Sequence, residues 1–555
     1  MALLQLLLLL LLSAVALGWV ARHFKFPYPI ALVAGGAVLG MIPNLPQYAF
    51  DPQLILVAVL PPILYQAALL TSWTDFKASI RPIGLLAIGL VAVTTLAVGA
   101  VLKLLVPDVP WAAAFVLGAI VSPPDAVAAT TILSRLNLPR RIVTILEGES
   151  LVNDASGLVL YKFAVAAVLT GAFSLVDATA QFALVSVGGI AVGVALAFVY
   201  IAVHRRLGDP FIEVLTVLTI PYSAYLAAEA LHTSGVLAVV AAGLVRGRYA
   251  PEIVSAEMRI MARSVWNVLV FLLNSLVFIL IGLQLHGVVQ NLGQFPSALL
   301  AAIAMSVTLV AVAVRFAWVY PVAYLPRSFA GGLRDDAKPG LAGRLQGGKA
   351  GPNRNELFII SWCGMRGIVS LAAALALPLT MADGSPFPYR DLIIFVTFVV
   401  IVATLIGQGL TLTPIVRKLR VGSRLRGHEE RRRVRAAMSA AALSAVDAAL
   451  EAEGAPPGWA DLLKAEIAAR IASETSDPGE QAPRTELLNR LRHAAIGAER
   501  RELIRLWRAN EIGDEVMHHL MEMLDYEQAQ LPAPSAADAE ATASMLVEDA
   551  AKPAS

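Results

Sequence analysis

Long apolar runs, separated by short charged segments, form the main pattern of this chain. Several runs approach the roughly 20 residues that an α-helix needs to cross the hydrocarbon core of a bilayer. The strict alternation of a barrel strand is absent, so the spans are predicted to be helices. The pattern predicts about thirteen spans: Met1 to Val20, Tyr28 to Ile42, Gln53 to Thr71, Ile83 to Val106, Trp111 to Leu133, Ile142 to Leu169, Phe182 to Val203, Phe211 to Leu231, Gly235 to Val245, Val265 to Leu285, Pro296 to Tyr320, Glu356 to Leu379 and Leu392 to Val416.

Lysine and arginine collect in every second connection between these spans. Basic connections stay on the cytoplasmic side of a membrane. We expect the N-terminus outside and the C-terminus in the cytoplasm, in a plasma membrane (the inner membrane of a bacterium). The clusters assigned to the cytoplasmic side are Arg22 with Lys25, Lys77 with Arg81, Arg135 with Arg140 and Arg141, Arg205 with Arg206, Arg246 through Arg263, Arg327 through Arg354, and Arg417 through Arg420.

An odd number of spans allows two six-helix halves, joined by one linker span, that enter the membrane from opposite faces. Inverted repeats of this kind are typical of secondary transporters. The predicted fold class is an all-α polytopic membrane protein. It has two inverted six-helix repeats, two broken helices that cross in the core, and a small helical cytoplasmic C-terminal domain.

The fifth span of each predicted half is interrupted. Pro123 and Pro124 remove two backbone donors in the middle of the first. In the second, Gly364 and Gly367 flank Arg366. Broken helices at matching positions indicate a binding site near the middle of the membrane. Because half-helix ends carry partial charges, Asp125 is predicted to neutralise exposed N-termini and Arg366 exposed C-termini.

The stretch from Ile145 to Phe163 places Glu149, Ser150, Asn153 and Asp154 inside a segment long enough to span the membrane. A charge at the bilayer centre costs roughly 3 kcal/mol on insertion scales, so it normally faces a cavity, a partner charge or an ion path. A lone carboxylate could simply form a buried ion pair. Two carboxylates and an amide within six residues favour a working site instead.

The composition agrees with a membrane protein and narrows the function. The chain of 555 residues is 57% hydrophobic and only 15% charged, with a mean hydropathy of +0.70. Its net charge of +2 gives no indication of nucleic-acid binding, and its single cysteine, Cys363, excludes an internal disulfide. The sequence becomes polar after Arg420. We predict a transmembrane domain over 1–420, a cytoplasmic helical domain over 421–531 and a disordered tail over 532–555.

Five segments resemble motifs of the cation/proton antiporter-1 family, the sodium/proton antiporters and exchangers, particularly its bacterial branch. They follow the family's order through most of the chain before the polar tail. The segments are Leu60-Pro61-Pro62-Ile63-Leu64, Ser122 to Ala128, Gly148 to Asp154, Glu229 to Gly235, and Gly364 to Gly367.

The resemblance implies a homodimer in which a core domain slides against a dimerisation domain by alternating access. It implies that Asp154 holds either a proton or a cation, that the Ser150 hydroxyl and the Pro124 carbonyl complete the cation ligands, and that Asn153 orients the site. Glu149 would pair with Arg366, and Asp125 would cap the helix break. Gln66 stands where many members carry an acidic residue; its amide oxygen could bind a cation, but it cannot titrate.

Alkali cations are hard ions that prefer oxygen ligands, by analogy with calcium and magnesium. One titrating aspartate beside the neutral Asn153 predicts exchange of one cation for one proton, hence electroneutral transport that serves pH homeostasis. Sodium is the expected cation, with potassium or lithium as alternatives. No cofactor is expected.

Two other classes compete with this interpretation. An intramembrane aspartyl protease could use Asp125 and Asp154 as paired carboxylates that share a proton, but the Gly-x-Gly-Asp pattern that such proteases resemble is missing. A passive cation channel predicts conductance without coupling to protons. A potassium/proton antiporter of the same fold also remains open at this point.

The charge pattern makes a topological prediction. Tags placed at the two ends should be accessible from opposite sides of sealed cells, the N-terminal tag from outside and the C-terminal tag only after permeabilisation. Labelling of both tags from one side would contradict the odd number of spans.

Overall fold

The computed structural model describes residues 2–23, 28–42, 52–125, 138–171, 175–254, 256–292, 295–324, 353–381, 383–419, 421, 426–453 and 478–509, with scattered positions between 458 and 465 and between 511 and 528. The chain forms two compact units, Met1–Ser423 and Arg424–Ser555. The predicted tail at 532–555 lies outside the described residues.

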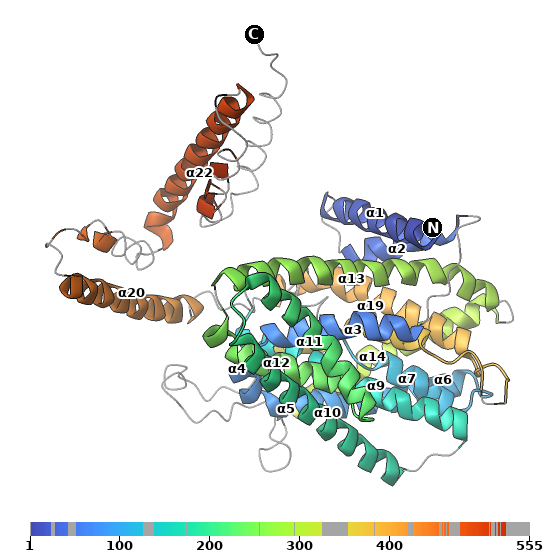
Figure 1. Ribbon diagram of the computed structural model, residues 1–555. Coiled ribbons are helices and arrows are strands. Elements are labelled where there is room, and N and C mark those ends of the chain that lie inside the picture. The colour runs from blue at the N-terminus through green and yellow to red at the C-terminus, as the bar shows by residue number, and fades with distance from the viewer. Residues whose placement is uncertain are drawn as a thin grey trace. The chain divides into compact units, whose positions relative to one another are not determined.

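The first unit is built from helices (Figure 1). Its only β-type pairing within the described residues is one isolated bridge between Thr380 and Pro386. The helices are α1 (Ala2–His23), α2 (Tyr28–Gly40), α3 (Pro52–Leu70), α4 (Trp73–Ala78), α5 (Ile80–Gly84), η1 (Leu85–Leu90), α6 (Val91–Leu105), α7 (Trp111–Val121), α9 (Arg140–Thr170), α10 (Leu175–His204), α11 (Pro210–Ala230), α12 (Gly235–Ile253), α13 (Ala256–Asn291), α14 (Ser297–Tyr324), α17 (Arg354–Trp362), α18 (Ile368–Leu375) and α19 (Arg390–Leu419).

Seven helices in the described part of the chain are long and apolar enough to cross a membrane: Ile80–Leu105, Arg141–Thr170, Thr179–His204, Pro210–Ala230, Met258–Leu280, Ser297–Ala323 and Arg390–Leu419. Shorter apolar helices accompany them. The predicted all-α membrane class is therefore confirmed. The exact number of spans stays a prediction.

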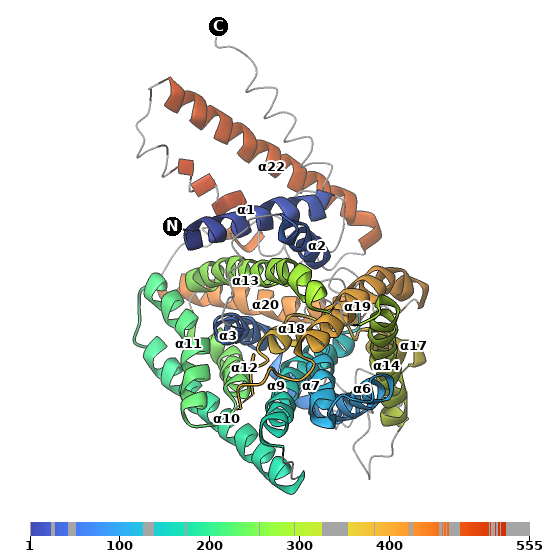
Figure 2. The same ribbon diagram turned by 90° about the vertical axis from the view of Figure 1, so that its right-hand side faces the viewer.

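The helices of this unit pack in two groups. In the first, α2 lies along α13, and α12 packs against α3, α10 and α11. In the second, α7 packs between α6 and α9, while α14 contacts α6, α17 and α19. Figure 2 shows α10, α11 and α12 on one side and α6, α14 and α17 on the other, with α9 between them. The long helix α9 contacts α3 and α12 of the first group, and α18 and α19 contact helices of the first group as well.

Both spans that were predicted to be broken are interrupted. Helix α7 ends at Val121, because Pro123 and Pro124 cannot donate to the preceding turn. Residues 126–133, the rest of that predicted span, lie outside the described residues. The second span divides into α17 and α18, with residues 363–367 non-helical between them.

A third irregularity had not been predicted. The span from Ile80 to Leu105 contains a π-helical turn, η1, between its α-helical parts α5 and α6. Such turns are rare and leave carbonyl groups out of the α-helical ladder. This turn packs against α9, the helix that carries most of the candidate residues.

The second unit contains two long helices, α20 (Arg426–Glu453) and α22 (Pro478–Arg508). Ile496 and Leu503 of α22 are buried, and Lys464 forms an ion pair with Asp447 of α20 at 2.5 Å. These contacts show local packing within this unit.

Candidate functional site

The two helix breaks touch each other. The backbone N–H of Asp125, just after α7, donates to the carbonyl of Met365 between α17 and α18 at 2.6 Å. A side chain at Gly367 would collide with the Asp125 carboxylate, so glycine is required there for this close approach. Asp125 therefore lies against the residue that precedes α18, where a negative charge is favourable.

Arg366 satisfies backbone carbonyls that the breaks leave free. Its Nε donates to the carbonyl of Val121, the last residue of α7, at 3.0 Å. Its terminal nitrogens donate to the carbonyls of Gly364 and of Ala311, the latter on α14. The Arg366 side chain is 2% exposed. A guanidinium group thus neutralises the carbonyl end of a half-helix inside the protein.

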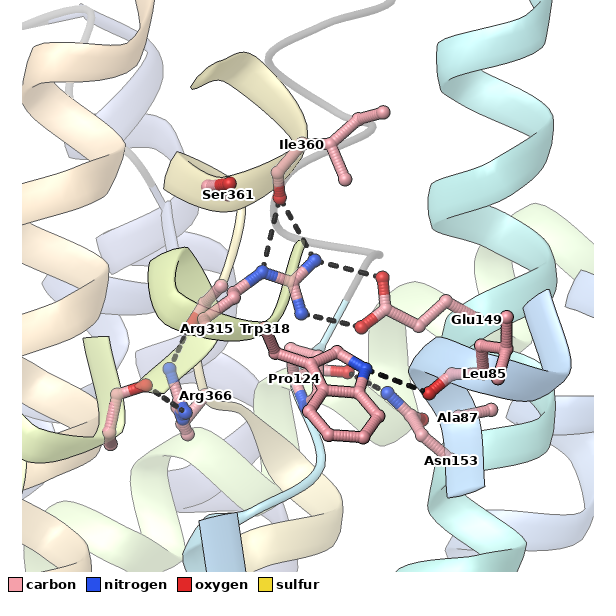
Figure 3. A network of polar contacts seen from close by, with 12 residues as sticks. Leu85, Ala87, Pro124, Glu149, Asn153, Arg315, Trp318, Ile360, Ser361 and Arg366 are labelled. Carbon is pink, nitrogen blue, oxygen red and sulfur yellow. Dashed lines mark hydrogen bonds and ion pairs between the residues drawn. The ribbon is translucent and has the colours of Figure 1, made fainter. Parts of the chain in front are cut away.

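Arg315 of α14 performs the same task at the second break (Figure 3). Its Nε and one terminal nitrogen donate to the carbonyl of Ile360, in the last turn of α17, at 3.1 and 3.0 Å. Its two terminal nitrogens also bind the two carboxylate oxygens of Glu149 at 2.5 and 2.8 Å. Both side chains of this bidentate pair are 1% exposed.

The predicted pairing of Glu149 with Arg366 is therefore wrong. The donors of Arg366 are directed to the carbonyls of Val121, Gly364 and Ala311, whereas Arg315 presents two parallel N–H groups to Glu149. A planar guanidinium matches a carboxylate in this bidentate arrangement.

Two other acidic residues within predicted spans, Glu213 and Glu229, are engaged elsewhere. Glu213 lies 3.4 Å from His204 Nε2, and Glu229 binds Lys162 at 3.0 Å.

The candidate cation and proton residues lie on α9 and at the end of the first break. Asp154 is 6% exposed, and Asp125 acts on it electrostatically. Asn153 is fully buried, and its Nδ2 donates to the carbonyl of Pro124 at 3.1 Å (Figure 3). Its Oδ1 has no hydrogen-bond partner in the described part of the chain. Ser150 precedes Asp154 by one helical turn on the same helix.

Two contacts around this group are absent from the sequence-based prediction. The hydroxyl of Ser156, also on α9, donates to the carbonyl of Ala87 in the π-helical turn. Trp318 Nε1 on α14 donates to the carbonyl of Leu85 at 3.1 Å in the same turn. Neither a serine nor a tryptophan in an apolar helix signals such a role, because the acceptors are backbone atoms of an irregular turn.

Gln66 lies on α3, and its Nε2 reaches Asn267 Oδ1 of α13 at 3.5 Å. Both helices belong to the first packing group. A contribution of Gln66 to the cation site stays a prediction.

Residues 8–418 match the family model described as the transmembrane sodium/hydrogen exchanger. The chain belongs to this family. The exchanger family consists of cation/proton antiporters, so this member is a transporter and not an enzyme. The aspartyl protease alternative is thereby set aside, and the resemblance seen in the five sequence motifs is confirmed.

Related exchangers cover the chain to different extents. An uncharacterised sodium/proton exchanger of Mycobacterium tuberculosis is 34% identical over 96% of both chains. A sodium, potassium, lithium and rubidium/proton antiporter of Bacillus pumilus is 35% identical over 72% of this chain and 59% of its own length. The solved sodium/proton antiporter MjNhaP1 of Methanocaldococcus jannaschii at pH 8 has a TM-score of 0.58 and 19% identity, covering 76% of this exchanger and 99% of that chain. At this identity the likeness shows a shared fold.

The buried pair makes a stability prediction. Removing one partner with Arg315→Met or Glu149→Gln should cost about 3 to 5 kcal/mol, because the other charge stays buried without a partner. The thermal midpoint of the purified exchanger should fall in both variants. The double variant should lose less than the two single effects combined.

Lys162→Met provides the matched control, since it breaks the ion pair with Glu229, whose side chains are 60% and 36% exposed. Exposed pairs contribute about 0 to 1 kcal/mol, so its midpoint should stay close to that of the parent. A double-mutant cycle in which Glu149 couples to Arg366 and not to Arg315 would refute the pairing.

Proposed function

We propose that the chain exchanges a monovalent cation, principally Na⁺, for a proton, with the Asp154 carboxylate as the site that both ions use in turn. The observation that carries this proposal is the buried position of Asp154 near Asp125, where the two helix breaks touch each other. The matching family model and the names of the relatives support cation/proton exchange. They leave the cation and the stoichiometry to experiment.

The proposed cation ligands are the Asp154 carboxylate, the Ser150 hydroxyl and the Pro124 carbonyl. Hard cations prefer such oxygen donors. Asn153 holds the Pro124 carbonyl through its Nδ2. Asn153 is therefore proposed to fix the direction of one ligand. Its Oδ1, which has no hydrogen-bond partner among the described residues, offers a further acceptor.

The charges around the breaks support a one-for-one exchange. Arg315 and Arg366 oppose Glu149, Asp125 and Asp154, and four of these five side chains are buried. With each group in its ordinary charge state, the cluster carries one negative charge in excess. One proton or one monovalent cation on Asp154 removes that excess. The two loaded states then have the same charge.

We further propose that the second packing group moves as one body against the first, in an elevator-type alternating access, and that the transporter is a homodimer in the plasma membrane. The support for a moving body is the connection of α7, α9, α14 and α17 through the two arginines. Displacing α9 alone would separate Glu149 from Arg315, at the cost of leaving two buried charges unpaired.

The central prediction concerns Asp154→Asn. The amide keeps the size of the side chain, but it removes the exchangeable proton and the charge that attracts the cation. Exchange in proteoliposomes containing an internal pH dye should fall to background while the protein still folds, because the substitution removes a buried charge.

Asp108→Asn is the matched control, since Asp108 is exposed in the connection between α6 and α7. It should leave exchange unchanged.

In the parent, the apparent cation affinity should weaken as the pH falls, because the carboxylate must be deprotonated to bind the cation. The affinity should fall by about tenfold per pH unit where the proton occupies most sites. Normal exchange by Asp154→Asn would move the carrier role to Glu149 or Asp125.

Electroneutral exchange is a separate prediction. A voltage imposed across the proteoliposome membrane with a potassium ionophore should not change the extent of sodium/proton exchange, because the charges of the two loaded states are equal. The same assay with lithium in place of sodium tests whether this holds for a second cation. A clear voltage dependence would require an additional proton carrier, and Lys162 of α9 would be the first candidate.

A further inference from the structure

Three ionisable side chains are buried together on helices that do not carry the proposed cation site. They are His204 at the end of α10, Glu213 in the first turn of α11 and Arg246 of α12, with exposed fractions of 2%, 7% and 2%. His204 Nε2 lies 3.4 Å from a carboxylate oxygen of Glu213. Arg246 acts electrostatically on both.

A fourth helix closes the cluster. Tyr65 of α3 is fully buried, and Arg246 acts on its hydroxyl. The Tyr65 ring packs on Trp266 of α13, with ring centroids 5.5 Å apart. Arg246 is a hydrogen-bond partner of the Tyr65 hydroxyl, and the backbone of Ile253 is a partner of the His204 ring. Within the described residues, one Glu213 oxygen and Trp266 Nε1 have no hydrogen-bond partner.

Burying three ionisable side chains together is costly. Buried polar atoms are almost always hydrogen-bonded, and an exception such as the Glu213 oxygen calls for an explanation. With a neutral imidazole, Glu213 and Arg246 balance each other. A proton on His204 would place a second cation beside Glu213, which could then form a charged pair with either one. Histidine is the side chain that makes this change near neutral pH.

We propose that His204, with Glu213 and Arg246, is a second proton-binding site, one whose proton is not transported and which sets the pH range of exchange. The regulatory part of this inference rests on the proposed cation/proton exchange. The proton-binding part does not.

The groups that face His204 come from several helices. Glu213 faces it from α11, and Asp209, which caps the N-terminus of α11, acts on Glu213. Arg246 faces it from α12. Tyr200, one turn earlier on α10, acts on Tyr65 of α3. The remaining charged neighbours in sequence are exposed: Arg205 and Arg206.

An apolar layer connects this cluster to α9. Tyr65, Val214 and Trp266 belong to the same buried apolar cluster as Leu151 and Ala155 of α9. Those two residues flank Asn153 and Asp154 in the sequence. Close-packed interiors transmit small displacements. A change of partner at Glu213 that shifts α3 or α12 would therefore reach the helix that carries the proposed ion site.

The test uses full-length protein labelled with ¹⁵N-histidine in lipid nanodiscs. Since the chain has eight histidines, the His204 ring signals are assigned by their loss in His204→Gln. They should titrate once between roughly pH 5 and 9, and Glu213→Gln should move that titration. In proteoliposomes at saturating sodium, His204→Gln should shift the pH of half-maximal exchange by about 0.5 unit or more, with a maximal rate within about twofold of the parent.

His23→Gln is the matched control, because His23 of α1 is exposed; its pH profile should overlay that of the parent. Ring signals of His204 that do not change over this pH range would overturn the proton site. A titrating ring with an unchanged pH profile would overturn its regulatory role. If the parent exchanges no alkali cation, the proposed function fails, and the ring titration still decides the proton site. Should His204→Gln fail to fold, the ring signal whose titration moves in Glu213→Gln identifies His204, and the absence of any such signal would overturn the proton site.

Discussion

The backbone carbonyls at the two helix breaks impose the constraint on which the rest of this structure depends. A membrane-spanning segment cannot leave such groups unpaired, because no water is present in the hydrocarbon core to satisfy them. The protein uses one guanidinium at each break, Arg366 for the end of α7 and Arg315 for the end of α17. Each arginine also contacts α14 or belongs to it, so the capping groups tie separate helices together.

The capping arginines in turn determine where the acidic residues are tolerated. Glu149 is held by Arg315 through two hydrogen bonds and is 1% exposed. Asp125 lies against the start of α18, where the free N–H groups of a helix favour a negative charge. Within the described residues, Asp154 forms no ion pair with either capping arginine. The paired charge of Glu149 and the proposed exchangeable charge of Asp154 are thereby separated within a few residues of one helix.

Much of this organisation could be predicted from the sequence because its causes are local. Adjacent prolines end α7, and glycines around Arg366 interrupt the second span, whatever surrounds them. The partner of Glu149 could not be predicted in this way. It depends on the rotation of α14 about its axis, which directs Arg315 rather than Arg366 at the carboxylate. The roles of Ser156 and Trp318 were equally hidden, since both bind backbone atoms of the π-helical turn. The His204 cluster assembles residues from four helices that no spacing rule connects.

The π-helical turn at Leu85–Leu90 also affects how this chain is compared with others. A π turn is wider than an α turn and holds an additional residue, so the helix after it is rotated relative to an uninterrupted helix. An alignment with a protein that lacks the turn therefore needs a one-residue gap inside Leu85–Leu90. Without that gap, every position of α6 is assigned to a neighbouring face, and the buried Thr94 and Thr95 are matched to residues with a different environment. Residue-by-residue transfer of roles between relatives is reliable on α6 only after this register has been set.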